Sequence, residues 1–133
     1  MPECYAPLPM SRARILLVDD SETVLFVLQT ALEEHFDVET APDGASGLER
    51  ARQSHPDIVV TDSLMPGLDG LGLLKALKAD PATKTIPVIV LTSEELPDFA
   101  AAAGNCQPAA VLAKSMDVSP LLDAIRSALM PRS

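Results

Sequence analysis

Four short apolar runs divide this chain, and each leads directly into polar residues. The runs cover residues 15–18, 58–60, 87–91 and 110–113, and a shorter alternating stretch covers residues 36–40. Continuous β-branched runs of this length, bounded by residues such as Pro56 and Pro66, are typical of strands buried on both faces of a parallel sheet. The pattern therefore predicts five strands.

Apolar residues at helical spacing predict a helix after each strand. The expected helices begin at or near Ser21, Asp43, Gly70, Pro97 and Ser119, and the third runs to Ala79. Ser21 suits a helix N-cap, and Ser119 followed by Pro120 is a good start signal for the last helix. Five strands alternating with five helices predict an α/β fold: a doubly wound, mostly parallel sheet with right-handed crossovers.

The length and composition fit one domain. The chain has 133 residues, of which 47% are hydrophobic, which is enough for a single buried core. We expect residues 1–13, which contain three prolines, to form a flexible extension. Residues 14–130 then form the domain, and residues 131–133 form a short tail.

The charge argues against several classes of function. A net charge of −9 lacks the clustered Lys and Arg that bind nucleic acid, whereas it suits a metal ion or a basic partner. Cys4 and Cys106 form no framework of cysteine pairs, which favours a reducing, cytoplasmic setting. No apolar run approaches the ~20 residues needed to insert into a membrane, and the N-terminus carries no export signal. His35 and His55 are interpreted as surface residues rather than ligands.

Polar side chains gather at the predicted carboxyl ends of the strands, where doubly wound sheets bind their ligands. These residues are Asp19 and Asp20 after the first strand, Asp62 after the third, Thr92 after the fourth and Lys114 after the fifth. Three neighbouring carboxylates repel one another unless a cation shares the site, and hard oxygen ligands suit Mg²⁺. A hydroxyl and an ammonium group beside that metal suit phosphoryl oxygens.

Asp62 is the central candidate, because a carboxylate beside a phosphate-binding group can act as a nucleophile and form an aspartyl phosphate. Taken singly, Asp62 could cap a turn, Asp19 or Asp20 could cap a helix, and Lys114 could be a solvated surface charge. Their joint occurrence at strand ends favours one shared site.

The motifs at these strand ends resemble those of a known family. They are Val18-Asp19-Asp20, Asp62 with Met65-Pro66-Gly67 and Asp69-Gly70, Leu91-Thr92-Ser93, and Lys114. From Arg14 to about Met130 the chain resembles a receiver domain of two-component response regulators, similar in layout to the single-domain chemotaxis type. The resemblance implies a flavodoxin-like sheet with strand order 2-1-3-4-5.

The resemblance also implies the chemistry of the acids. Asp62 would accept a phosphoryl group from a sensor histidine kinase or a histidine phosphotransfer protein. Asp20 and Asp62 would bind Mg²⁺ directly, Asp19 would act largely through water, and the backbone carbonyl of Leu64 would add a ligand.

Thr92 and Lys114 would bind the phosphoryl group, and their movement would repack the surface made by the fourth helix, fifth strand and fifth helix. A downstream protein would read that surface, and the resemblance also allows a dimer. The chain would be a phosphoacceptor switch that catalyses only its own phosphorylation and dephosphorylation, and otherwise not an enzyme.

Three features depart from the family pattern. Val111 stands where an aromatic switch residue is common, and Ser115 replaces the proline that usually follows the lysine. Pro97 and the sequence Gly104-Asn105-Cys106-Gln107-Pro108 suggest a short or irregular fourth helix, so the signalling surface is expected to be unusual. Separately, Leu64 and Glu94 occupy the two positions that tune phosphate lifetime in the family. Signal transmission and phosphate lifetime therefore do not follow from the resemblance.

Two other classes compete with this interpretation. An aspartate-nucleophile phosphatase would carry a second Asp two residues after the nucleophile, where this chain has Leu64. A binding module with a degenerate site would have lost one of the acids or the lysine, and none is lost.

Because the sequence leaves no room for an output domain before Ser133, we expect a stand-alone regulator; a receiver excised from a larger multidomain regulator is the alternative.

Overall fold

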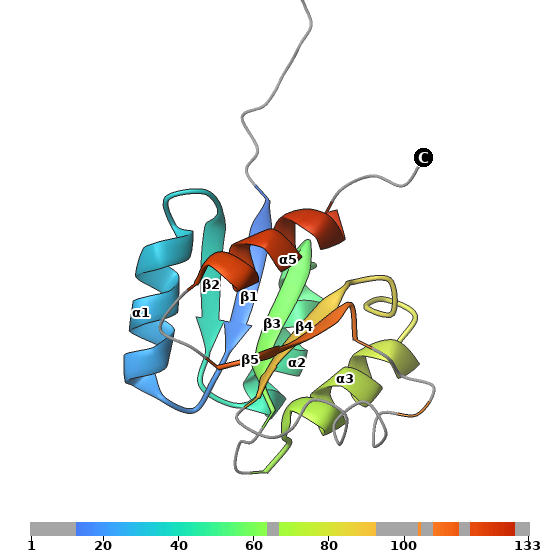
Figure 1. Ribbon diagram of the computed structural model, residues 1–133. Coiled ribbons are helices and arrows are strands. Elements are labelled where there is room, and N and C mark those ends of the chain that lie inside the picture. The colour runs from blue at the N-terminus through green and yellow to red at the C-terminus, as the bar shows by residue number, and fades with distance from the viewer. Residues whose placement is uncertain (1–12, 64–66, 93–103, 105–107, 115–117, 130–133) are drawn as a thin grey trace, which may run out of the picture.

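The computed structural model describes residues 13–63, 67–92, 104, 108–114 and 118–129. Its strands are β1 (Arg14–Val18), β2 (Asp37–Ala41), β3 (Ile58–Asp62), β4 (Val88–Thr92) and β5 (Ala110–Ala113). They form one parallel sheet in the order β2-β1-β3-β4-β5, which confirms the expected fold class and strand order (Figure 1).

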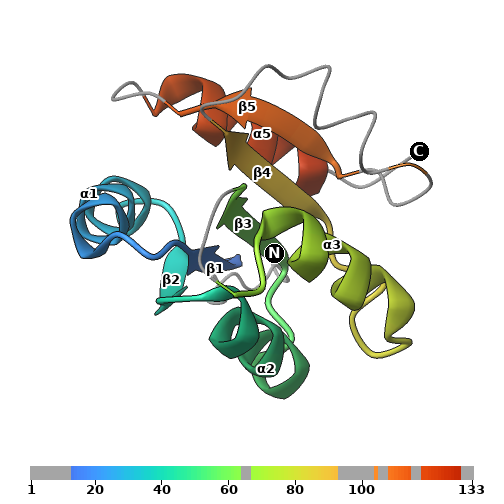
Figure 2. The ribbon, with the colours of Figure 1, turned by 90° about the horizontal axis from the view of Figure 1, so that it is seen from below.

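Four helices are described: α1 (Glu22–Leu32), α2 (Gly44–Ser54), α3 (Gly70–Ala79) and α5 (Ser119–Leu129). Helices α1 and α5 cover one face of the sheet and α2 and α3 cover the other (Figure 2). The helix expected after Pro97 lies outside the described residues, as do nearly all of the expected extension and tail. None of the described helices is long and apolar enough to cross a membrane.

Alternating residues of each strand build the two layers of the core. Ile15 and Leu17 pack toward α1 and α5, whereas Leu16 and Val18 pack toward α2 and α3. All four are at most 1% exposed. The apolar runs are therefore continuous because both faces of the sheet are covered.

Side-chain caps fix where the helices begin. The side chain of Ser21 accepts a hydrogen bond from the N–H of Val24 at 3.3 Å, and Asp43 and Asp69 cap α2 and α3 in the same way, each at 2.8 Å. These contacts satisfy N–H groups that a helix cannot satisfy itself. Because α1 and α3 follow β1 and β3 closely, the caps also fix the chain just beyond the strand ends.

Several predicted boundaries were wrong by one residue, and the strands expected at residues 36–40 and 87–91 are each shifted by one residue at both ends. Strand β2 begins at Asp37 rather than Phe36, because Phe36 ends the α1 turn with its N–H bonded to the carbonyl of Leu32. Strand β4 begins at Val88 rather than Pro87. Ser119, expected as an N-cap, is the first residue of α5, since the carbonyl of Val118 already accepts the N–H of Leu122.

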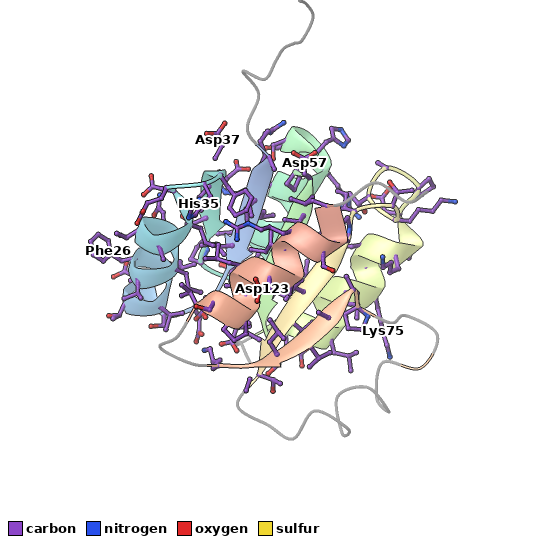
Figure 3. All side chains as sticks on the ribbon, turned by 45° about the horizontal axis from the view of Figure 1, so that its top comes forward. Phe26, His35, Asp37, Asp57, Lys75 and Asp123 are labelled. Atoms are coloured by element: carbon purple, nitrogen blue, oxygen red, sulfur yellow. The ribbon has the colours of Figure 1, made fainter. Side chains whose placement is uncertain are left out.

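The surface predictions for the histidines are confirmed, because His35 and His55 are both exposed. Phe26 on α1 is 70% exposed, and its ring points away from the sheet (Figure 3). His35, Asp37 and Asp57 lie at the end of the molecule where β2 and β3 begin, far from the carboxyl ends of the strands.

Candidate functional site

The candidate site lies at the carboxyl ends of β1, β3, β4 and β5. One carboxylate oxygen from each of Asp19, Asp20 and Asp62 lies within 4.8 Å of the other two. Asp19 and Asp62 are only 2% and 6% exposed, whereas Asp20 is exposed. The structure therefore brings together the three acids that the sequence analysis singled out, with one of them open to solvent.

Lys114 joins two of these acids. Its Nζ lies 3.0 Å from Oδ2 of Asp62 and 3.4 Å from Oδ2 of Asp19. The lysine directly follows β5, whose backbone is tied to β4 by a 3.0 Å hydrogen bond from the N–H of Lys114 to the carbonyl of Thr92. Lys114 is thus a partner of the acids rather than a solvated surface charge.

Burial and crowding disturb the ionisation of Asp19. Burial raises the pKa of its carboxyl group above the ordinary value, and the nearby Asp62 carboxylate raises it further. A 2.8 Å hydrogen bond from the N–H of Ser21 and the Lys114 ammonium group act in the opposite direction without reversing the shift. Burial, the largest effect on this carboxyl group, therefore outweighs the contacts that favour its ionised form.

The charges also act on the lysine. Burial alone would lower the pKa of Lys114, but its hydrogen bond to Asp62 and the charges of Asp19 and Asp62 raise the pKa above the ordinary value. The ammonium group therefore stays protonated at neutral pH, where it can hold an anion beside Asp62.

Thr92 ends β4 next to these groups and is fully buried. Asp62 pairs with Leu91 in the sheet, so Thr92 stands one residue further along the adjacent strand. This register puts the hydroxyl-bearing residue beside the end of β3. Leu64, the expected backbone ligand, lies outside the described residues.

Ser63 is a residue of this region that the sequence pattern does not mark. Its N–H donates to the carbonyl of Leu91 at 2.9 Å, and its carbonyl accepts from the N–H of Gly70 at 3.0 Å. Its side chain is buried, with Ser63 only 3% exposed. A serine directly after the acid of an apolar strand was the available signal, but burial could not be deduced from it.

The donor set fits a divalent cation. Three carboxylates offer hard oxygen ligands, and Asp20 keeps one side of the cluster accessible to solvent. The three carboxylates also outnumber the single Lys114 ammonium group that lies among them. The residues present are thus chemically suited to Mg²⁺.

Comparison with known proteins agrees with this geometry. Residues 15–126 match the family model of the response regulator receiver domain. Protein PilH of Pseudomonas aeruginosa is 44% identical over 84 residues, which are 62% of this chain and 69% of PilH. Response regulator PleD of Caulobacter vibrioides is 44% identical over 82 residues, or 61% of this chain but only 18% of PleD.

Solved structures share the fold of this chain over most of its length. The chemotaxis protein CheY4 of Vibrio cholerae superimposes with a TM-score of 0.84 and 28% identity, covering 90% of this chain and 100% of that one. A response regulator receiver domain protein from Clostridium thermocellum gives a TM-score of 0.80 and 32% identity, covering 88% and 94%. With its strand order and its acids at the strand ends, this chain belongs to the family of response regulator receiver domains.

Proposed function

We propose that this chain accepts a phosphoryl group on Asp62 from the phosphohistidine of a sensor histidine kinase or a histidine phosphotransfer protein. The observation that carries the proposal is the buried Asp62 carboxylate with the Lys114 ammonium 3.0 Å away. A nucleophile with a fixed positive charge beside it suits attack on an anionic phosphoryl group.

In this reaction an Asp62 oxygen bonds to phosphorus as the bond between phosphorus and the histidine nitrogen breaks. The electron pair of the broken bond returns to the imidazole of the donor. Lys114 holds the transferred oxygens, and the Thr92 hydroxyl donates a hydrogen bond to one of them. Because both residues lie at strand ends next to Asp62, they are close to the transferred group when the donor arrives.

Asp20 and Asp62 are the proposed direct ligands of Mg²⁺, with Asp19 acting largely through water and the carbonyl of Leu64 as a further ligand. Bound Mg²⁺ would neutralise charge on the phosphoryl oxygens and on the crowded carboxylates. The carboxylate oxygens within 4.8 Å of one another support this assignment.

The proposed consequence is a change in partner binding rather than turnover of a substrate. Movement of Thr92 and Lys114 toward the phosphoryl group would act on β5 directly, since Lys114 follows that strand and its N–H is bonded to Thr92. A downstream protein would then read the surface that includes β5 and α5. Val111 on β5 packs against the core, and this position carries no aromatic ring that could rotate.

The rival phosphatase function is less well supported, because the chain offers Leu64 where a general acid would stand. A receiver within a larger regulator would use the same site, and PleD shows that such a segment can match a small part of a longer protein. In either case Asp62 has the same role.

The test is phosphorylation with acetyl phosphate and Mg²⁺, followed by intact-mass spectrometry. The parent chain should gain one phosphoryl group, and Asp62→Asn should gain none. Asp123→Asn, on the exposed side of α5, is the matched control and should be labelled like the parent (Figure 3). Equal labelling of Asp62→Asn and the parent would show that another residue is the acceptor.

A further inference from the structure

Ser63 carries an unexplained feature. Among the residues that the structure describes, its Oγ is the buried side-chain oxygen without a hydrogen-bond partner. A buried hydroxyl with no partner lowers the stability of the fold, so its presence calls for a physical reason. Local freedom of the backbone is not the reason, because both the N–H and the carbonyl of Ser63 are hydrogen-bonded.

The sheet register brings Ser63 beside Thr92. Asp62 pairs with Leu91, and the N–H of Ser63 continues the ladder by donating to the carbonyl of Leu91. The next pair along the two strands is therefore Ser63 and Thr92. Side chains alternate between the faces of a sheet.

The same face of the sheet receives both side chains. Val59 on β3 and Val88 and Val90 on β4 pack toward α2 and α3. Ser63 comes four residues after Val59, and Thr92 comes two residues after Val90. Because an even number of residues separates each pair, Ser63 and Thr92 lie on this same face of the sheet. The hydroxyl-bearing residues Ser63 and Thr92 are thus neighbours on one face of the sheet. Ser63 directly follows the proposed acceptor Asp62, and Thr92 is the residue proposed to bind the phosphoryl group.

We infer that Ser63 is a positioning residue for Thr92: its hydroxyl donates to Oγ1 of Thr92 when Thr92 donates its own proton to the phosphoryl group. A threonine hydroxyl has one proton and two lone pairs, so a Thr92 that donates to an anion can still accept a hydrogen bond. Ser63 supplies that donor from the next strand. This inference rests on the proposed function of Asp62 and Thr92.

Such a chain of hydrogen bonds would strengthen the contact with the anion, because each bond polarises the next. It would also give Ser63 Oγ a hydrogen-bond partner, which this hydroxyl lacks among the described residues. The buried hydroxyl would therefore favour the phosphorylated state by destabilising the other one.

The test measures the affinity for beryllium fluoride, a phosphoryl analogue, by calorimetry with Mg²⁺ present. Ser63→Ala should weaken binding about fivefold, the effect of one lost hydrogen bond. In a Thr92→Ser background, which keeps the hydroxyl, the same loss should appear; in a Thr92→Val background Ser63→Ala should change nothing. Unliganded Ser63→Ala should melt a few degrees higher than the parent.

The outcomes separate this inference from the proposed function. If the parent binds beryllium fluoride but Ser63→Ala binds it equally well, Ser63 has no positioning role and Asp62 is unaffected. A loss of the same size in the Thr92→Val background would also overturn the inference, since it would show an effect independent of Thr92. A parent chain that takes neither beryllium fluoride nor a phosphoryl group would overturn the proposed function, and the inference with it.

Discussion

At the residue level, the positive charge of Lys114 partly neutralises the negative charges of the acids around it. The ammonium group lies 3.0 Å from Asp62 and 3.4 Å from Asp19, within the region where a metal ion would bind. The lysine therefore has two opposing effects. It attracts an incoming anion, but it also repels a cation bound to the same carboxylates.

Replacing this lysine should strengthen metal binding. Lys114→Met removes a positive charge near the metal ligands and should tighten Mg²⁺ binding about fivefold, because like charges ~4 Å apart repel by about 1 kcal/mol even at the dielectric constant of water. Isothermal titration with Mg²⁺ measures the change. Lys75→Met, on the exposed side of α3, is the control and should bind like the parent (Figure 3). Weaker binding by Lys114→Met would mean that the lysine organises the site instead.

At the scale of elements, α3 starts in close contact with the end of β3. A Cβ atom added to Gly70 would lie 2.3 Å from the carbonyl oxygen of Asp62 and 2.8 Å from Cα of Ser63. Two residues further along α3, a Cβ on Gly72 would meet mainly the Leu68 side chain, whose Cδ1 can move. A methyl group can therefore be added at Gly72 by moving a side chain, whereas at Gly70 it requires backbone movement.

Substitution of these glycines should have opposite effects. Gly70→Ala should lower the free energy of unfolding by about 1–3 kcal/mol, because backbone must move to admit the new atom. Gly72→Ala should be neutral or should stabilise by up to about 1 kcal/mol, since alanine is the better helix former. Urea unfolding followed by circular dichroism measures both. A similar loss in the two variants would contradict the close contact between Gly70 and β3.

The end of α3 is held by a different contact. Asp80 Oδ1 accepts the N–H of Ala82 at 2.9 Å, and Oδ2 accepts from Nε of Arg52 on α2 at 2.7 Å. The hydrogen bond from Ala82, and then the contact with Arg52, lower the pKa of Asp80 below its ordinary 3.8. The carboxylate thus links the turn before β4 to the neighbouring helix.

This contact should make stability depend on pH in a defined direction. Because the pKa of Asp80 is lower in the folded state, its carboxylate contributes to the free energy of unfolding above pH 3.8. That contribution is lost as the pH falls through the pKa of the folded state. Asp80→Asn should therefore melt slightly below the parent at neutral pH, and the difference should vanish in acid. Asp123→Asn controls for the general effect of removing one negative charge. A difference that persists unchanged in acid would exclude the carboxylate as its cause.

At the scale of the whole molecule, the net charge of −9 and three crowded acids leave a surplus of negative charge. Any ion that binds the folded chain more tightly than the unfolded chain raises the free energy of unfolding. Unspecific screening by salt also reduces repulsion across the molecule. A measurement must therefore separate the two effects.

Mg²⁺ at tenfold excess over its dissociation constant should stabilise the chain by about 1.4 kcal/mol beyond NaCl of equal ionic strength. Thermal unfolding in the two salts measures the increment, and chelation by EDTA should remove it. Asp20→Asn should lose most of this increment while folding normally, since Asp20 is exposed. An unchanged increment in that variant would locate the metal elsewhere.

Much of this molecule could be predicted because its signals are local. The apolar runs 15–18, 58–60 and 110–113 lie within the strands observed, and α3 has the predicted bounds of Gly70–Ala79. The errors at Phe36, Pro87 and Ser119 are single residues at element ends, where one backbone hydrogen bond decides the boundary. The fourth helix and Leu64 stay predictions, because they lie outside the described residues.

The order of residues along the chain shows which residue types follow each strand, and parallel strands necessarily bring their carboxyl ends to one edge of the sheet. That is why Asp19, Asp20 and Asp62 could be grouped without coordinates. The folded chain was needed to show that Lys114 contacts both Asp19 and Asp62. It was also needed to show that Ser63 lies beside Thr92 and that its buried Oγ has no hydrogen-bond partner among the described residues. Those features depend on register, side-chain reach and burial, which arise from contacts between distant segments rather than from the pattern along the chain.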